Sequence, residues 1–118
     1  MNVLSRREEP DIIVFEFEGR IVLGRDSHGI EEMVDEALAR NDRKLVFDLT
    51  EVDYLDSAGL GIIVACVGKA RKRDGDLLVA ELRSRLHELV KITGLDRVLG
   101  LYPTAAEACR AFGSDSLK

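Results

Sequence analysis

The chain is poor in the residues that build metal sites and disulfide frameworks. Its 118 residues include two cysteines, two histidines and no tryptophan. Neither His28 nor His87 has a second ligand at a recognisable offset, and the two cysteines lie far apart, so we expect no metal site and no cofactor. Cys66 and Cys109 fall on the apolar faces of predicted helices. We therefore expect buried free thiols, which suit a reducing compartment.

Long apolar segments are also absent. The longest purely apolar run covers residues 62–67 and is far too short to span a bilayer. A signal peptide needs an apolar stretch near the N-terminus, but this chain has charged side chains there, at Arg6, Arg7, Glu8 and Glu9. We expect no targeting segment, no membrane insertion and a cytoplasmic location.

Positive charge is in the minority. The chain has 17 Lys and Arg against 22 Asp and Glu, a formal net charge of −5. Its one basic run, residues 69–73, is closed by Asp74 and Asp76, and such a run late in a helix suits the helix dipole. Nucleic acid binding needs a clustered Lys/Arg surface that releases counterions. The expected partner is therefore a protein.

Hydrophobic periodicity predicts strands and helices in alternation. A period of two over residues 11–19 indicates a strand with one wet face, whereas the spacing of Ile30, Met33, Val34, Ala37 and Leu38 indicates an amphipathic helix. Strands are expected at residues 2–5, 11–19, 44–50, 75–82 and 98–102, and helices at 29–39, 57–71, 86–93 and 105–112. Residues 6–11 are expected to form a turn, and residues 19–29 a loop.

The order of these elements predicts one α/β domain over residues 1–113. Strands alternating with helices favour a mixed, mostly parallel sheet of about five strands with about four helices, and the opening hairpin adds an antiparallel member. Gly94 is a candidate left-handed cap, and Thr104 with Glu107 forms a capping box. Residues 114–118 are expected to fray.

One stretch, "YLDSAGLGI" at residues 54–62, concentrates the functional interest. Ser57 follows a buried strand and opens a helix, where unpaired N–H groups and the positive end of the dipole favour an anion such as phosphate. Gly59 and Gly61 have no side chains that would add bulk around Ser57, so a partner could approach closely. Equally, Asp56 or Ser57 could be a structural N-cap.

Enzyme motifs do not fit this stretch. A hydrolase elbow, G-x-S-x-G, would need a glycine at Leu55, and neither histidine is placed to serve as a base. A dinucleotide fingerprint would need a third glycine at Val64. We therefore expect a protein that is not an enzyme.

The longer stretch "KLVFDLTEVDYLDSAGLGIIV" resembles the core motif of STAS domains, in particular the bacterial anti-sigma factor antagonists. The family's D-S-x-G-L-G pattern falls on residues 56–61. The resemblance continues through "EGRIVLG", "DGDLLVAEL" and "VKITGLDRVLGLYPTAAEA", so it covers nearly the whole chain.

This resemblance implies the STAS fold and a partner-switching protein. In that family an anti-sigma factor with serine/threonine kinase activity phosphorylates the serine after the aspartate, and a serine phosphatase resets it. Ser57 would be the phosphoacceptor, Asp56 would orient it or contact the kinase, and the loop of residues 19–27 would add binding surface. The implied partner-binding residues are Asp56, Ser57, Ala58, Gly59, Leu60, Gly24, Arg25, Asp26 and Ser27.

The sequence departs from the family pattern at two positions. Many members carry a second hydroxyl residue at the position of Ala58, and many have an aspartate at the position of Val22, near the kinase-contacting surface. The second departure indicates a divergent branch. An alternative is a STAS subunit that forms a constant complex, for example in lipid transport or a signalling scaffold, and is indifferent to the charge at Ser57.

Overall fold

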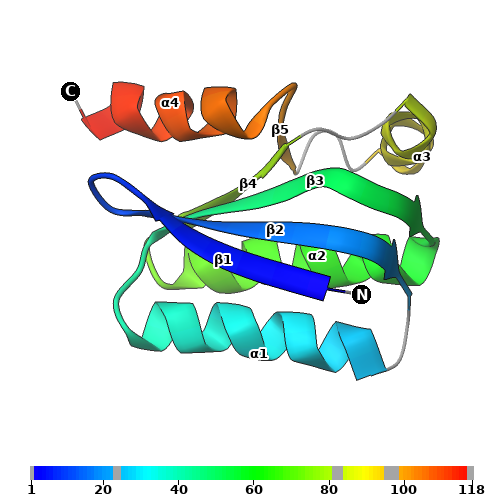
Figure 1. Ribbon diagram of the computed structural model, residues 1–118, viewed down its shortest axis with the longest axis horizontal. Coiled ribbons are helices and arrows are strands. Elements are labelled where there is room, and N and C mark those ends of the chain that lie inside the picture. Colours follow the sequence, from blue (N-terminus) through cyan, green and yellow to red (C-terminus); the bar gives the residue numbers. More distant parts are fainter. Residues whose placement is uncertain (1, 23–24, 81–83, 95–98, 117–118) are drawn as a thin grey trace.

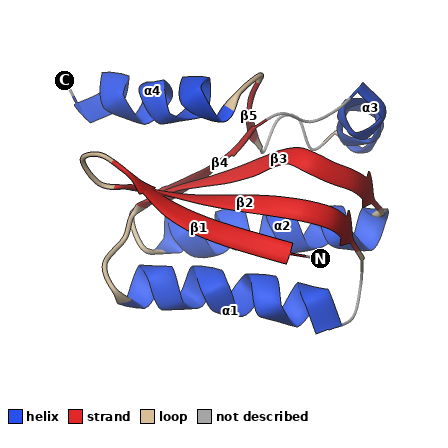
Figure 2. Cartoon of the chain, in the orientation of Figure 1, coloured by secondary structure: helices blue, strands red, loops and turns tan. Residues whose placement is uncertain are grey.

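A computed structural model describes residues 2–22, 25–80, 84–94 and 99–116. It shows a five-stranded mixed sheet in the order β1-β2-β3-β4-β5, with α1 and α2 on one face and α4 on the other (Figures 1 and 2). The elements are β1 (Asn2–Glu8), β2 (Ile12–Ile21), α1 (Arg25–Ala39), β3 (Lys44–Leu55), α2 (Ser57–Lys72), β4 (Asp76–Ala80), α3 (Ser84–Thr93), β5 (Gly100–Tyr102) and α4 (Ala105–Ser116). The α/β class and mostly parallel sheet are confirmed.

The opening hairpin is longer than predicted. β1 pairs antiparallel with β2 from Asn2 opposite Glu18 to Glu8 opposite Ile12, so the turn is confined to residues 9–11. The prediction of a turn from residue 6 was wrong because it read charge as a loop signal. On an edge strand, charged side chains face water, and Arg6 forms ion pairs with Glu8 and Glu16.

The predicted loop at residues 19–29 was wrong at both ends. β2 continues to Ile21, which pairs with Leu55 at the end of a similarly extended β3, and α1 begins at Arg25. Gly19 has a φ of 96° and stands between two register shifts of the β2–β3 ladder. The glycine therefore marks a bulge within the strand rather than its end.

Alternate residues of the strands pack against α1 and α2. Phe47 makes edge-to-face contacts with Phe15 and Phe17, at centroid separations of 5.8 and 4.7 Å. The expected apolar face of α1 lies in this core, with Met33 only partly buried. This packing holds both helices parallel to the sheet, with their first turns at the same end of the domain (Figure 1).

Only part of the opposite face of the sheet is exposed to solvent. Ile12 and Val14 are buried there beneath α4, together with Val46 and Leu78. The prediction of one wet face along β2 was therefore wrong for the first half of that strand, because α4 follows much later in the sequence. The second half, with Glu16 and Glu18, stays accessible.

The C-terminal elements follow the prediction with shifted bounds. Gly94, after α3, has the expected left-handed φ of 75°, and the Thr104 Oγ1 accepts the Glu107 N–H at 3.1 Å. α3 begins at Ser84 instead of Leu86, and α4 continues past Phe112 to Ser116. The predicted strand positions 81–82 and 98 lie outside the described residues.

Gly59 sets how closely α2 approaches the end of β2. A Cβ at this position would lie 2.5 Å from the Ile21 carbonyl oxygen and 2.8 Å from the Leu55 Cδ1. A backbone oxygen cannot move away as a flexible side chain can. Gly61, two residues later, has open space around it. Packing therefore requires a glycine at position 59 but not at position 61.

We expect Gly59→Ala to lower the free energy of unfolding by about 2 kcal/mol, because overpacking forces α2 away from β2. The matched control, Gly61→Ala, should raise it by about 0.5–1 kcal/mol through helix propensity. Urea unfolding of both variants measures the difference. A neutral Gly59→Ala would contradict the close approach.

The two cysteines differ in exposure. Both are free thiols, but Cys66 on α2 is fully buried, whereas Cys109 on α4 is half-buried, contrary to the expectation that both are buried. Burial raises the pKa of the Cys66 thiol to about 12, with a further contribution from Glu31. Burial also raises the pKa of Cys109, to a smaller extent.

At pH 8 we expect iodoacetamide to alkylate Cys109 at least about a hundredfold faster than Cys66. The pKa of about 12 at Cys66 leaves little thiolate there, and the burial of Cys66 keeps the reagent away from it. Mass spectrometry of timed digests gives the two rates. In denaturant the rates should converge. Comparable rates in the folded protein would mean that α2 is not packed as described.

Candidate functional site

The candidate site lies where β3 ends and α2 begins. Leu55 is the last residue of β3, and Ser57 is the first residue of α2. The first turns of α1 and α2 both follow carboxyl ends of parallel strands, at the right of Figure 1. Ligand and partner sites of α/β sheets gather at this edge.

Asp56 is the N-cap of α2, which decides between the two capping alternatives. Its backbone is extended, with φ −93° and ψ 178°, and its Oδ1 accepts the Gly59 N–H at 2.7 Å. Its carbonyl oxygen accepts the Leu60 N–H at 2.9 Å. The cap therefore uses the aspartate and leaves the neighbouring serine free of this structural duty.

Ser57 is exposed, and its hydroxyl makes no hydrogen bond to any described residue. In the first turn of a helix, the N–H groups of the leading residues have no intrahelical acceptor. At α2 these are the N–H groups of Ser57 and Ala58, since Gly59 and Leu60 donate to Asp56. A solvent-exposed hydroxyl can take up an anionic group here without breaking a hydrogen bond to a described residue, beside two N–H groups that have no acceptor within the helix.

The other residues of the motif at positions 56–61 include both surface residues and core residues. Ala58 is half-buried and Gly61 is exposed, whereas Gly59 and Leu60 are buried, the latter 1% exposed. Gly59 and Leu60 therefore face the core and fix the position of the first turn. The part of the motif that a partner can touch is formed by Asp56, Ser57, Ala58 and Gly61.

The second group of predicted contact residues lies at the same end of the domain. Arg25, Asp26 and Ser27 form the first turn of α1 rather than a loop, while Gly24 lies outside the described residues. Val22, at the position where the family often has aspartate, is half-buried just after β2.

Sequence reasoning missed a cation–aromatic pair near the carboxyl ends of β2 and β3. Arg20 and Tyr54 are partners in the β2–β3 ladder, and the Arg20 guanidinium lies 4.4 Å from the centre of the Tyr54 ring, which is 40% exposed. The pairing depends on a register shift after Gly19. No pattern within either strand alone could reveal it.

The imidazole of His28 contacts Glu32 on its own helix, 3.2 Å away, and no described histidine is hydrogen-bonded to Ser57. Among the described helices, none is long and apolar enough to cross a bilayer.

Comparison with known proteins identifies the family. The model of the STAS domain matches residues 4–108. The anti-sigma-B factor antagonist of Listeria monocytogenes is 44% identical over 55 residues, a match that covers 47% of this chain and 48% of that protein. The match thus spans about half the length of this relative.

Solved structures agree over almost the full chain. An anti-sigma factor antagonist from Mycobacterium paratuberculosis has a TM-score of 0.81 at 28% identity, covering 93% of this chain and 92% of its own. The Bacillus protein SpoIIAA, solved unphosphorylated and phosphorylated, has TM-scores of 0.73 and 0.72 at 9% and 12% identity, with coverage of at least 94% of either chain, which shows the shared fold. The chain belongs to the STAS domain family, and the relatives from Listeria, Mycobacterium and Bacillus described above are named anti-sigma factor antagonists.

Proposed function

We propose that this protein is an anti-sigma factor antagonist that is switched off by phosphorylation of Ser57. Unmodified, it binds an anti-sigma factor and so frees a sigma factor for transcription in the cytoplasm. The anti-sigma factor, acting as a serine/threonine kinase, phosphorylates Ser57, and a serine phosphatase restores the binding form. The observation that carries the proposal is the exposed Ser57 hydroxyl, which makes no hydrogen bond to a described residue because Asp56 caps the helix in its place.

The unmodified surface suits close contact with a partner. Ser57 and Ala58 are small, and Gly61 adds no side chain. A partner backbone can therefore approach the first turn of α2, with the Ser57 hydroxyl inside the contact. Arg25, Asp26 and Ser27 in the first turn of α1 would extend this surface.

A phosphate would change this contact and leave the fold in place. It adds about −1.5 to −2 charges near Asp53 and Asp56, on a chain of net charge −5, so a partner shaped for a hydroxyl meets repulsion and a desolvation cost. Within the domain, the helix dipole and the N–H groups of Ser57 and Ala58 favour an anion. That SpoIIAA is solved in both forms supports a fold that tolerates the modification.

We expect Ser57→Ala to bind the anti-sigma factor as the wild type does and to resist phosphorylation, whereas Ser57→Glu binds at least about tenfold more weakly. The measurement is affinity capture from lysate of the native organism on parallel baits, followed by titration of the captured protein. Ser5→Glu, at an exposed serine on β1, controls for added charge and should bind normally.

Equal binding of the same partners by the Ser57→Glu and wild-type baits would contradict the switch. It would favour the alternative of a constitutive subunit in a lipid-transport or signalling complex.

The cap itself can be tested separately from the phosphate. We expect Asp56→Ala to lower the free energy of unfolding by about 1 kcal/mol, because the Gly59 N–H loses its acceptor. Asp56→Asn keeps an acceptor oxygen at the same place and should restore most of that loss. Thermal and urea unfolding decide the matter, and an Ala variant as stable as the wild type would show that another group caps α2.

A further inference from the structure

The outer face of the sheet carries a second surface that the Ser57 site does not use. α4 covers this face over Val14 and Val46, but the next residues along the same strands are not covered by a described helix. In the sheet register, Leu4, Glu16 and Asp48 form one row across β1, β2 and β3. Glu18 and Glu51 lie opposite each other in the next row. We call these five residues the open face.

Like charges stand directly opposite each other here. Glu16 is paired in register with Asp48, and Glu18 with Glu51. Such cross-strand pairs destabilise a sheet unless a cation lies between them. Arg6 lies against Glu16 and offsets the first pair, but Glu18 and Glu51 have no such cation among the described residues. Folding does not explain why the second pair is there.

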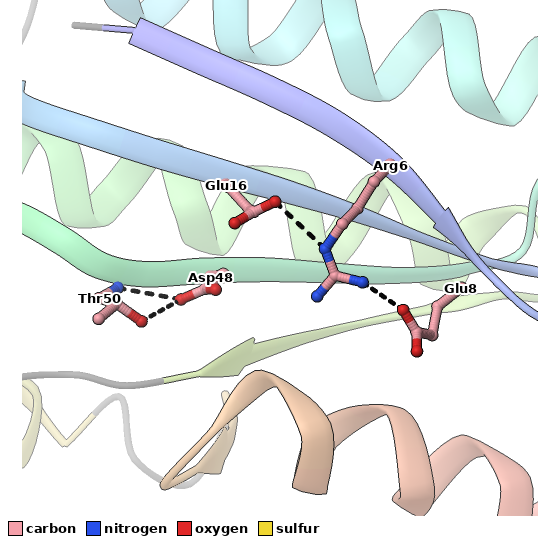
Figure 3. Close-up of polar contacts among 5 residues, drawn as sticks. All are labelled: Arg6, Glu8, Glu16, Asp48 and Thr50. Carbon is pink, nitrogen blue, oxygen red and sulfur yellow. Dashed lines mark hydrogen bonds and ion pairs between the residues drawn. The ribbon is translucent and has the colours of Figure 1, made fainter.

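The described part of the domain supplies little positive charge to this face. Arg6 on β1 donates to Glu16 at 3.1 Å and pairs with Glu8, and Asp48 accepts the Thr50 N–H at 3.0 Å and the Thr50 hydroxyl (Figure 3). Glu18 and Glu51 have no ion-pair partner among the described residues. The open face thus remains strongly acidic.

The same face is hollowed and partly apolar. Two hollows of about 390 and 170 Å³ lie over it and share Glu16, Phe17 and Glu51 in their lining. Leu4 borders the larger hollow and is 72% exposed, the largest exposed fraction of an apolar side chain on the sheet. A partner that fills this groove would need both cationic groups and an apolar side chain.

We propose that the open face is a docking surface for a basic segment of a partner protein that also carries apolar side chains. Lysine or arginine side chains would neutralise the facing carboxylates, and an apolar side chain would cover Leu4. Charge complementarity favours this occupant over a second copy of the chain, because a second copy carries the same net charge of −5. Some of its basic side chains also have acidic partners already, as Lys69 has Asp35 and Lys44 has Asp11. A metal ion is not favoured, since no described group of three His, Cys, Asp or Glu residues is arranged to hold one.

This surface is separate from the Ser57 site. α2 lies on one face of the sheet and the open face is on the other (Figure 1). A segment docked at the open face would hold a partner independently of the phosphate. The test of this proposal is therefore independent of the test of the switch at Ser57.

The test is an NMR titration of the whole domain, at physiological salt, with a short amphipathic peptide of lysine and leucine. We expect amide shifts to concentrate at the open face. Glu18→Gln/Glu51→Gln should weaken binding roughly tenfold, because two exposed charge pairs with the peptide are lost. The same double variant should raise Tm by about 2–5 °C, because it relieves the repulsion between the two carboxylates. The matched control, Glu32→Gln/Glu36→Gln, removes the same charge from exposed positions on α1 and should leave affinity unchanged.

Several results would overturn the proposal. Equal weakening in both double variants would show attraction by net charge alone, and equal binding of a lysine–serine peptide would exclude a role for Leu4. Absence of binding would also overturn it. Shifts of the same amides on concentrating the protein alone would assign the face to a second copy of the chain.

Discussion

The close packing of α2 against the end of β2 is the constraint on which the candidate site depends. Gly59 approaches the Ile21 carbonyl more closely than any side chain would allow, and Asp56 closes the first turn by accepting the Gly59 N–H. Together they fix a helix N-terminus at the carboxyl edge of the sheet. Ser57 is held at that N-terminus, where its side chain is exposed and its hydroxyl makes no hydrogen bond to a described residue.

The two faces of the sheet differ in how much of each is covered by helices. The face beneath α1 and α2 carries the larger hydrophobic core, with the aromatic contacts of Phe15, Phe17 and Phe47. The other face is buried only under α4, and its remainder is acidic and open. The larger hydrophobic cluster therefore lies on one side of the sheet and a smaller one on the other. The other side can tolerate opposed carboxylates such as Glu18 and Glu51.

Local patterns in the sequence predicted the fold class and the central motif, but not what depends on register. The apolar spacing from Ile30 to Leu38 gave α1, and the Asp56–Ser57 pair gave the helix start, because each signal lies within one element. The extension of β1 to Glu8 and the bulge at Gly19 depend on a neighbouring strand. The buried state of Val14 depends on α4, almost a hundred residues later. The opposed carboxylates appear only once two strands are aligned.

The most direct test of a switch that spares the fold is the free energy of unfolding of the protein carrying phosphoserine at position 57, measured in urea against the unmodified chain. We expect the two values to agree within about 1 kcal/mol, because the helix N-terminus offsets the repulsion from Asp53 and Asp56. A loss greater than about 2 kcal/mol would contradict this. Phosphorylation would then act by loosening the domain rather than by changing its surface.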